Sequence, residues 1–270
     1  MLFVMRTSLA LHARVRHRLL EAVVLRLARL PEAGGLVLRG GLLLRHWFRP
    51  LIRPAQDLDL VADRPLTLGD AAAWLPLFAD NDVHDGVRFD PTRVRVEAIW
   101  EQTVHRGLRF QAWGQFGDDE GLVQVDITGG PAPTPPAEWG TLPTASGHFA
   151  YMKLCRAEHV LGQKIQALWH MGEERWRPKD LFDLSVLLER TSIDVTVLHE
   201  TLRALMAEIG ASMAEAHGVL GPGLWWQTKR AAARWSDFAS VGWGRTAPSE
   251  LATLLECVRP RLASLLEEGR

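Results

Sequence analysis

The chain has 270 residues, of which 47% are hydrophobic and 23% are charged, so it is too apolar for a disordered tail and long enough for one large or two small cores. Its two cysteines, Cys155 and Cys257, exclude a disulfide framework and a four-cysteine zinc site. Arginines interrupt the N-terminal apolar stretches, so we expect neither a membrane span nor a signal peptide, and we predict a cytoplasmic protein.

The net charge of −1 conceals a basic N-terminal segment. Residues 1–53 hold ten arginines, no lysine and two acids, which is an excess of +8. Such a surface suits a phosphate-rich partner, because contacts with phosphate are largely electrostatic. A solvated helix face is the alternative explanation, and the charge excess alone does not distinguish the two.

The first half of the chain mixes helical and strand patterns. Apolar residues at helical spacing predict an amphipathic opening helix, and alternation of polar and apolar residues predicts strands. Helices are predicted at 6–30, 42–47 and 67–78, the last with Thr67 and Asp70 as a capping box. Strands are predicted at 36–38, 57–61, 92–100, 108–116 and 122–127.

The second half is predicted to be helical. A proline-rich segment at 129–136 interrupts regular structure. Helices are then expected at 155–170, 179–189, 194–209, 223–240 and 248–268. We therefore predict an α/β domain over residues 1–150 and a helical domain over residues 151–270.

Acidic side chains mark a candidate metal site in the first half. Asp57 and Asp59 alternate on one strand, so both face the same side, where a divalent cation would relieve their repulsion. Gly40 and Gly41 end the preceding strand and let a phosphate approach the backbone at a helix start. Asp126 lies in an otherwise apolar strand and is a third candidate ligand. Three such carboxylates suit two-metal nucleotidyl transfer, whereas Asp-x-Asp alone could simply cap a loop.

Charged residues also recur in the helical half. Lys164 follows Glu158 by six residues and could reach a triphosphate or form a surface ion pair with Glu158. We expect loss of Lys164 to weaken nucleotide binding without lowering the melting temperature much. Asp180 and Asp183 share one helix face after Pro178, and first-turn acids that compensate the helix dipole would give the same pattern.

Four blocks in this order resemble the AbiEii/AbiGii nucleotidyltransferase toxins, also described as MenT-type toxins. They cover residues 36 to 188 and comprise Leu38-Arg39-Gly40-Gly41 with Arg53-x-x-x-Asp57-x-Asp59, the strand that bears Asp126, Glu158…Lys164, and Arg177-Pro178-Lys179-Asp180-Leu181-Phe182-Asp183-Leu184.

The resemblance implies a polymerase-β-like nucleotidyltransferase core with a helical C-terminal region. It also implies the toxin of a toxin–antitoxin or phage-defence pair, which transfers NMP from an NTP to RNA, at the tRNA 3′ end, and blocks translation. Mg²⁺, a nucleoside triphosphate, tRNA and a cognate antitoxin are the implied cofactor, substrate and partners. By position, Asp57, Asp59 and Asp126 would bind metal, and Gly40, Gly41, Arg53 and Lys164 would bind nucleotide. Asp57, Asp59, Lys164 and Asp180 would be catalytic.

Two positions depart from the family pattern. Leu42 follows Gly-Gly where Ser or Thr is usual, and Ala55 stands where Ser is common, so a hydroxyl contact and a phosphorylation site are missing. Neither change removes a carboxylate or Lys164, which favours an active enzyme. The alternatives are a phosphotransferase that moves the γ-phosphate to a protein target, and an inactive protein that binds RNA or a partner.

Overall fold

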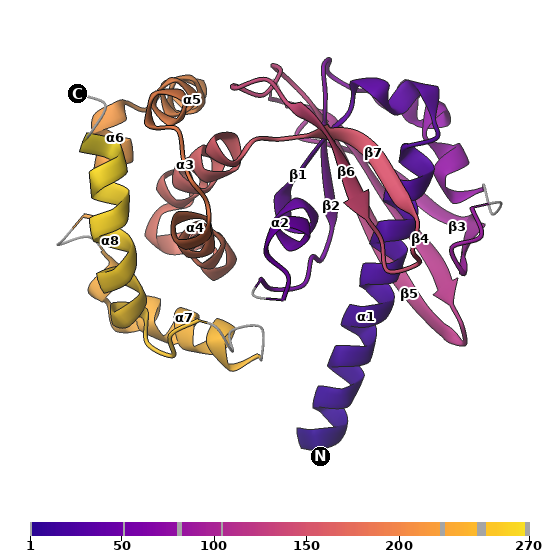
Figure 1. Ribbon diagram of the computed structural model, residues 1–270, viewed down its shortest axis with the longest axis horizontal. Helices are drawn as coiled ribbons and strands as arrows, with labels where there is room; N and C mark the ends of the chain where they lie inside the picture. The colour runs from indigo at the N-terminus through magenta and orange to yellow at the C-terminus, as the bar shows by residue number, and fades with distance from the viewer. Residues whose placement is uncertain are drawn as a thin grey trace. The chain divides into compact units, whose positions relative to one another are not determined.

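The computed structural model describes residues 2–50, 52–79, 83–103, 105–221, 225–241 and 247–267, with the side chains of residues 2–11 and 32 left out (Figure 1). The chain divides into two compact units, each of which we describe by itself. The first unit comprises Met1–Trp47, Pro54–Ala132 and Ala137–Cys155. The second comprises Phe48–Arg53, Pro133–Pro136 and Arg156–Arg270.

The first unit is built on a mixed sheet. Within the described residues the sheet has seven strands in the order β3-β4-β5-β2-β1-β7-β6. The strands are β1 (Val37–Arg39), β2 (Leu58–Ala62), β3 (Val87–Ile99), β4 (Gly107–Phe116), β5 (Asp119–Gly129), β6 (Glu138–Pro143) and β7 (Phe149–Leu154). The helices of this part are α1 (Leu2–Leu27) and α2 (Gly40–Phe48), with 3₁₀ helices η1 (Pro31–Gly35), η2 (Leu68–Ala73) and η3 (Leu75–Phe78). β2 pairs in parallel with β5, and β1 pairs in parallel with β7, while the other neighbours are antiparallel.

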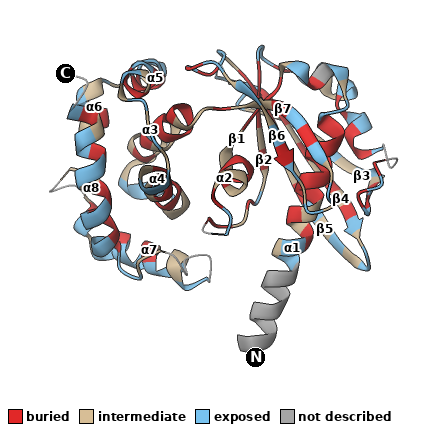
Figure 2. Ribbon diagram, in the orientation of Figure 1, coloured by how far each residue is buried: buried red, intermediate tan, exposed pale blue. Residues whose placement is uncertain are grey.

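One face of this sheet forms the hydrophobic core with α1. Phe110 and Val125 are register partners on β4 and β5, and both are fully buried. Leu19 of α1 lies against the same face, within van der Waals distance of the positions of Gly114 and Gly121. Because side chains alternate along a strand, the residues between these core positions point to the opposite face. Figure 2 shows the buried residues of α1 gathered where the helix meets the sheet.

For the first unit one prediction was wrong and two strands were missed. The segment 67–78 forms η2 and η3 instead of one α-helix, although Asp70 accepts hydrogen bonds from the backbone and hydroxyl of Thr67, as the predicted capping box requires. Strands β6 and β7 were not predicted. Their alternation, with Leu142, Ala150 and Met152 buried, is interrupted by a turn at 144–147, so each run is too short to stand out from the proline-rich segment before it.

The second unit is helical in its described part. Its helices are α3 (Ala157–Arg175), α4 (Pro178–Arg190), α5 (Val195–Glu208), α6 (Met213–Gly218), η4 (Trp225–Gln227), α7 (Lys229–Ser240) and α8 (Leu251–Glu267). α3 packs against α4 and α5, and the fully buried Leu161, Leu184 and Trp235 lie in the core. The predicted helix at 223–240 is present as η4 and α7, and α6 was not predicted. Among the described residues, no helix is both long and apolar enough to cross a membrane.

Candidate active site

Charged side chains form a row across the face of the sheet opposite α1. Consecutive register pairs join Glu97 on β3 to Arg109 on β4, Arg109 to Asp126 on β5, Asp126 to Asp59 on β2, and Asp59 to Arg39 on β1. Register partners share a face and lie about one strand spacing, ~5 Å, apart. Five residues that are far apart in the sequence are thereby brought together by strand order alone. We call them, with Asp57, the charged row.

Asp126 lies beside Asp59, as expected from the sequence, but its carboxylate is held by Arg109. Arg109 donates from Nε to Oδ1 and from a terminal nitrogen to Oδ2, both at 2.8 Å. The hydrogen bond to Asp126 is the main cause that raises the pKa of Arg109, and the charges of Glu97 and Asp57 raise it further. The carboxylate of Asp57 is therefore close enough to Arg109 to act on it through its charge.

Gly40 makes room for the carboxylate of Asp59. The glycine has φ +74°, and a Cβ at this position would lie 2.1 Å from Oδ2 of Asp59. A side chain is thus excluded both by the left-handed backbone and by the close approach. The sequence pattern suggested that the glycine pair admits a phosphate, whereas the structure shows that Gly40 leaves room for the carboxylate of Asp59. α2 begins at the same residue, so unpaired backbone N–H groups of its first turn lie beside Asp59.

The charged row fits a divalent cation better as a pair of ligands than as a triad. In the described part of the chain, no three His, Cys, Asp or Glu side chains are grouped so that they could hold one metal ion. Asp57 and Asp59 suit Mg²⁺, which is commonly bound by one or two carboxylates together with substrate phosphates. Four carboxylates against two guanidinium groups leave the row with a net charge of −2, which favours a divalent cation. Metal binding by Asp126 stays a prediction, and it requires Asp126 to exchange Arg109 for the ion.

Buried ion pairs form a second cluster, in the helical unit. Lys164 of α3 contacts Asp180 at 2.8 Å and Asp183 at 2.9 Å, both on α4. Arg53 donates to both oxygens of Asp183, at 2.9 and 2.7 Å, and Arg177 donates to Asp180 at 2.6 Å. Three cations against two acids leave this cluster with a net charge of +1.

The cluster corrects two readings of the sequence. Lys164 does not pair with Glu158, which contacts Arg156 and accepts from the backbone of Asp194. Asp183, for which a first-turn acid that compensates the helix dipole was the alternative explanation, is fully buried and joins α4 to Arg53 and Lys164.

Charge pairing outweighs burial in this cluster. Burial opposes the charged form of Lys164, but Asp183 and Asp180 outweigh it and raise the pKa of Lys164. Burial likewise opposes ionisation of Asp180, yet Lys164 and Arg177 lower the pKa of Asp180 to about 2. The pKa of Asp183 is lowered by Lys164 and Arg53 against the same opposition from burial. All members are therefore charged at neutral pH, and removal of Lys164 leaves each of the two buried acids with a single cationic partner, Arg177 or Arg53.

The departures from the family pattern are accommodated by packing. Leu42 and Ala55, which replace the usual hydroxyl residues, are 5% and 1% exposed and belong to the core.

Arg39 is a site residue that the sequence indicated only as part of a motif. It donates to Thr128, whose hydroxyl donates to the carbonyl of Leu60. Arg109 had no local signal, because its importance comes from the β4–β5 register.

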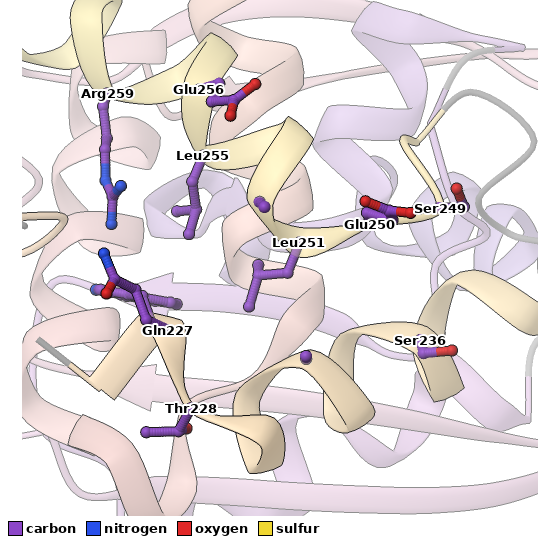
Figure 3. A pocket seen from close by; sticks show the side chains of 12 residues that line it. Gln227, Thr228, Ser236, Ser249, Glu250, Leu251, Leu255, Glu256 and Arg259 are labelled. Atoms are coloured by element: carbon purple, nitrogen blue, oxygen red, sulfur yellow. The ribbon is translucent and has the colours of Figure 1, made fainter.

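A cavity of about 620 Å³ lies in the helical unit, and its lining residues come from positions 226–259 (Figure 3). Residues of η4, α7 and α8 line it, among them Gln227, Ser236, Glu250 and Arg259. None of the predicted site residues lines this cavity.

Known proteins show similarity at the level of family and fold. The model of the AbiEii family, described as a nucleotidyl transferase toxin of type IV toxin–antitoxin systems, matches residues 22–241. The crystal structure of JHP933 from Helicobacter pylori superposes with a TM-score of 0.56 at 13% identity, over 94% of this chain and 91% of the other. A second structure from H. pylori, described as a nucleotidyltransferase, has a TM-score of 0.51 at 15% identity, over 94% and 92%. No curated protein matches the sequence significantly. The family match covers most of the chain, which therefore belongs to the AbiEii nucleotidyl transferase toxin family.

Proposed function

We propose that this AbiEii protein is a magnesium-dependent enzyme that transfers a nucleoside monophosphate from an NTP to RNA, with the 3′ end of tRNA as acceptor, and so blocks translation. Membership of a type IV toxin–antitoxin family implies a cognate antitoxin that opposes this activity. The observation that carries the proposal is the charged row, in which Asp59 lies beside the N-terminus of α2 and is the register partner of Arg39.

Each part of the charged row has a chemical use in this reaction. Asp57 and Asp59 would hold Mg²⁺, which supplies positive charge to the triphosphate and to its leaving group. The N–H groups at the start of α2 can donate to phosphate oxygens, and Arg39 adds a cation next to Asp59. Gly40 keeps this approach open, because any side chain there would displace the Asp59 carboxylate.

The proposal also gives Lys164 and Asp180 a role in nucleotide binding. Lys164 has three N–H donors, and two of them serve Asp180 and Asp183. The net charge of +1 in its cluster suits an anionic triphosphate. Asp180 and Asp183 fix the direction of the ammonium group of Lys164, and Arg53 holds Asp183 in position through its ion pair. In this scheme Lys164 touches phosphate, whereas Asp180 and Arg53 position it.

A label-transfer experiment tests the proposal directly. Purified protein is incubated with tRNA, MgCl₂ and each NTP carrying ³²P at either the α or the γ position. We expect α-label on tRNA, loss of the signal with EDTA, and at least a hundredfold slower transfer by Asp59→Asn. Asp118→Asn, which changes an exposed acid of the same unit, is the matched control and should transfer at the wild-type rate.

The other outcomes separate the alternatives. Transfer of γ-label to a protein would replace the proposal with phosphotransfer. Absence of transfer from any NTP, with RNA still bound, would identify a binding protein that lacks this activity.

Growth of cells provides a second test. Expression without the antitoxin should arrest growth, and Asp59→Asn should relieve the arrest at an equal protein level. Equal toxicity of the variant would contradict a catalytic origin of the toxicity.

A further inference from the structure

The hairpin of β6 and β7 displays aromatic rings on one exposed face. Trp139, Tyr151 and Phe149 are 51%, 59% and 68% exposed. Trp139 stacks on Tyr151 with ring centroids 5.0 Å apart and an interplanar angle of 15°. The ammonium group of Lys153 lies 5.7 Å from the centroid of Trp139. We call these four residues the aromatic platform.

Strand alternation explains why these rings face solvent. Phe149, Tyr151 and Lys153 alternate along β7 with the buried Ala150 and Met152, so the two sets lie on opposite faces. Figure 2 shows this alternation of exposed and buried positions along β7. Large aromatic side chains are costly to expose, and a cluster of them on a sheet indicates a binding surface.

The aromatic platform lies on the same face of the sheet as the charged row. Trp139 on β6 is the register partner of Lys153 on β7, and Lys153 is the register partner of Val37 on β1. Val37 lies two residues before Arg39 on the same strand, so its side chain and that of Arg39 are on the same face. Three strand spacings separate β6 from β2, which is about 14 Å across the sheet. The aromatic platform and Asp59 therefore belong to the same face of one sheet, although Val37 between them is buried.

We propose that the aromatic platform binds unpaired bases at the single-stranded end of the RNA acceptor. Bases stack on exposed aromatic rings with little dependence on sequence, and single-stranded RNA is commonly recognised on sheet surfaces in this way. Lys153 supplies the cation for the phosphate next to a stacked base. The inference rests on the proposed function, because it identifies the part of the RNA that the same sheet face receives.

The chemistry of the platform favours RNA over a protein partner. The two stacked rings and their adjacent ammonium group offer flat π-faces and one positive charge. An apolar protein surface would gain nothing from the ammonium group of Lys153, whereas a nucleotide uses both the ring and the charge. A protein partner or a second copy of the chain is therefore an outcome of the test.

The experiment measures binding of a fluorescein-labelled eight-nucleotide single-stranded RNA to the full chain by anisotropy, with a duplex of equal length for comparison. Tyr151→Ala and Trp139→Ala should each weaken binding of the single strand roughly 5- to 100-fold, as loss of one stacked base does. Tyr151→Phe keeps the ring and should bind as the wild type does. Trp100→Ala removes a tryptophan that is 55% exposed outside the aromatic platform, and this control should have no effect. Lys153→Gln should reduce the slope of log affinity against log salt by about 0.7.

The results separate failure of the platform from failure of the proposed function. Lost RNA binding in both alanine variants, with unchanged melting temperatures, supports the platform even if no nucleotide is transferred. Wild-type transfer and affinity in both variants would overturn the platform while the proposed enzyme stands. The platform is also overturned if the wild type does not prefer the single strand to the duplex. Unchanged RNA affinity combined with lost self-association in sedimentation would assign this face to a second copy.

Discussion

Lys164 should be as important for stability as for activity, and Lys164→Ala tests this. The lysine neutralises two carboxylates that are 1% and 0% exposed, Asp180 and Asp183. Lys164→Ala breaks two buried ion pairs at once and leaves each acid with one cation, Arg177 or Arg53, so we expect a cost of about 3–5 kcal/mol, as for removal of one partner from a buried pair. The direction of the pKa shift agrees with this, because Lys164 and Arg177 lower the pKa of Asp180 to about 2 against the opposing effect of burial.

Thermal unfolding followed by circular dichroism measures the effect. At about 3 °C per kcal/mol, Lys164→Ala should lower the melting temperature by roughly 10–15 °C. Lys229→Ala changes an exposed lysine of the same unit and should alter stability by less than about 0.5 kcal/mol. Adding Asp183→Asn to Lys164→Ala should deepen the loss, because the buried Arg53 then also loses its ion pair with Asp183.

The pH dependence gives an independent check. The pKa values of Asp180 and Asp183 are lowered in the folded state, so their pairing stabilises the protein fully above about pH 5 and is lost as the pH falls toward 2. The difference in stability between wild type and Lys164→Ala should therefore narrow on acidification. A melting temperature within 2 °C of wild type at pH 7, together with weakened nucleotide binding, would refute this reasoning. It would restore the expectation from sequence that Lys164 serves nucleotide binding alone.

Three further substitutions test other parts of the structure. Gly40→Ala should destabilise the first unit by about 1–3 kcal/mol and abolish transfer, and normal activity would disprove the close approach to Asp59. Arg109→Gln removes a positive charge and makes the net charge of the charged row more negative by one, so calorimetry should show Mg²⁺ binding that is roughly fivefold tighter or more. Unchanged Mg²⁺ affinity would show that the charge of Arg109 does not act on the metal site. Arg26→Met breaks the ion pair with Asp85 at 2.7 Å, where both side chains are at most 3% exposed, and should cost about 3–5 kcal/mol in chemical denaturation. An unchanged denaturation midpoint would show that the cost of burying the two charges equals the attraction between them.

Local patterns in the sequence predicted most of the elements that carry the charged row. The strand at 57–61 and the segment 122–127 are present as β2 and β5, and their parallel pairing places Asp59 opposite Asp126. The opening helix is also present, and the mixed α/β architecture agrees with the fold of the two H. pylori structures. These features depend on periodicity within one segment, which a single sequence displays.

Features that depend on pairing between distant segments could not be predicted. Arg109 belongs to the site only because β4 pairs with β5 in a register that sets it opposite Asp126. Asp183 lies one helical turn from Asp180, and this spacing in the sequence is the same for acids that face solvent and for acids that pair with buried cations. The structure shows that Asp183 pairs with Lys164 and Arg53. The aromatic platform escaped notice because its two short strands follow a proline-rich segment that suggested irregular structure.

The two charged clusters differ in a way that bears on the reaction. The charged row, with its net charge of −2, has Asp57 and Asp59 only partly buried, so a cation can reach them while the Arg109–Asp126 pair stays intact. The cluster around Lys164, with its net charge of +1, buries both of its acids and neutralises them internally. The charge of the row therefore suits a cation, and the charge of the cluster suits an anion. The Asp59 and Lys164 variants test these two expectations separately.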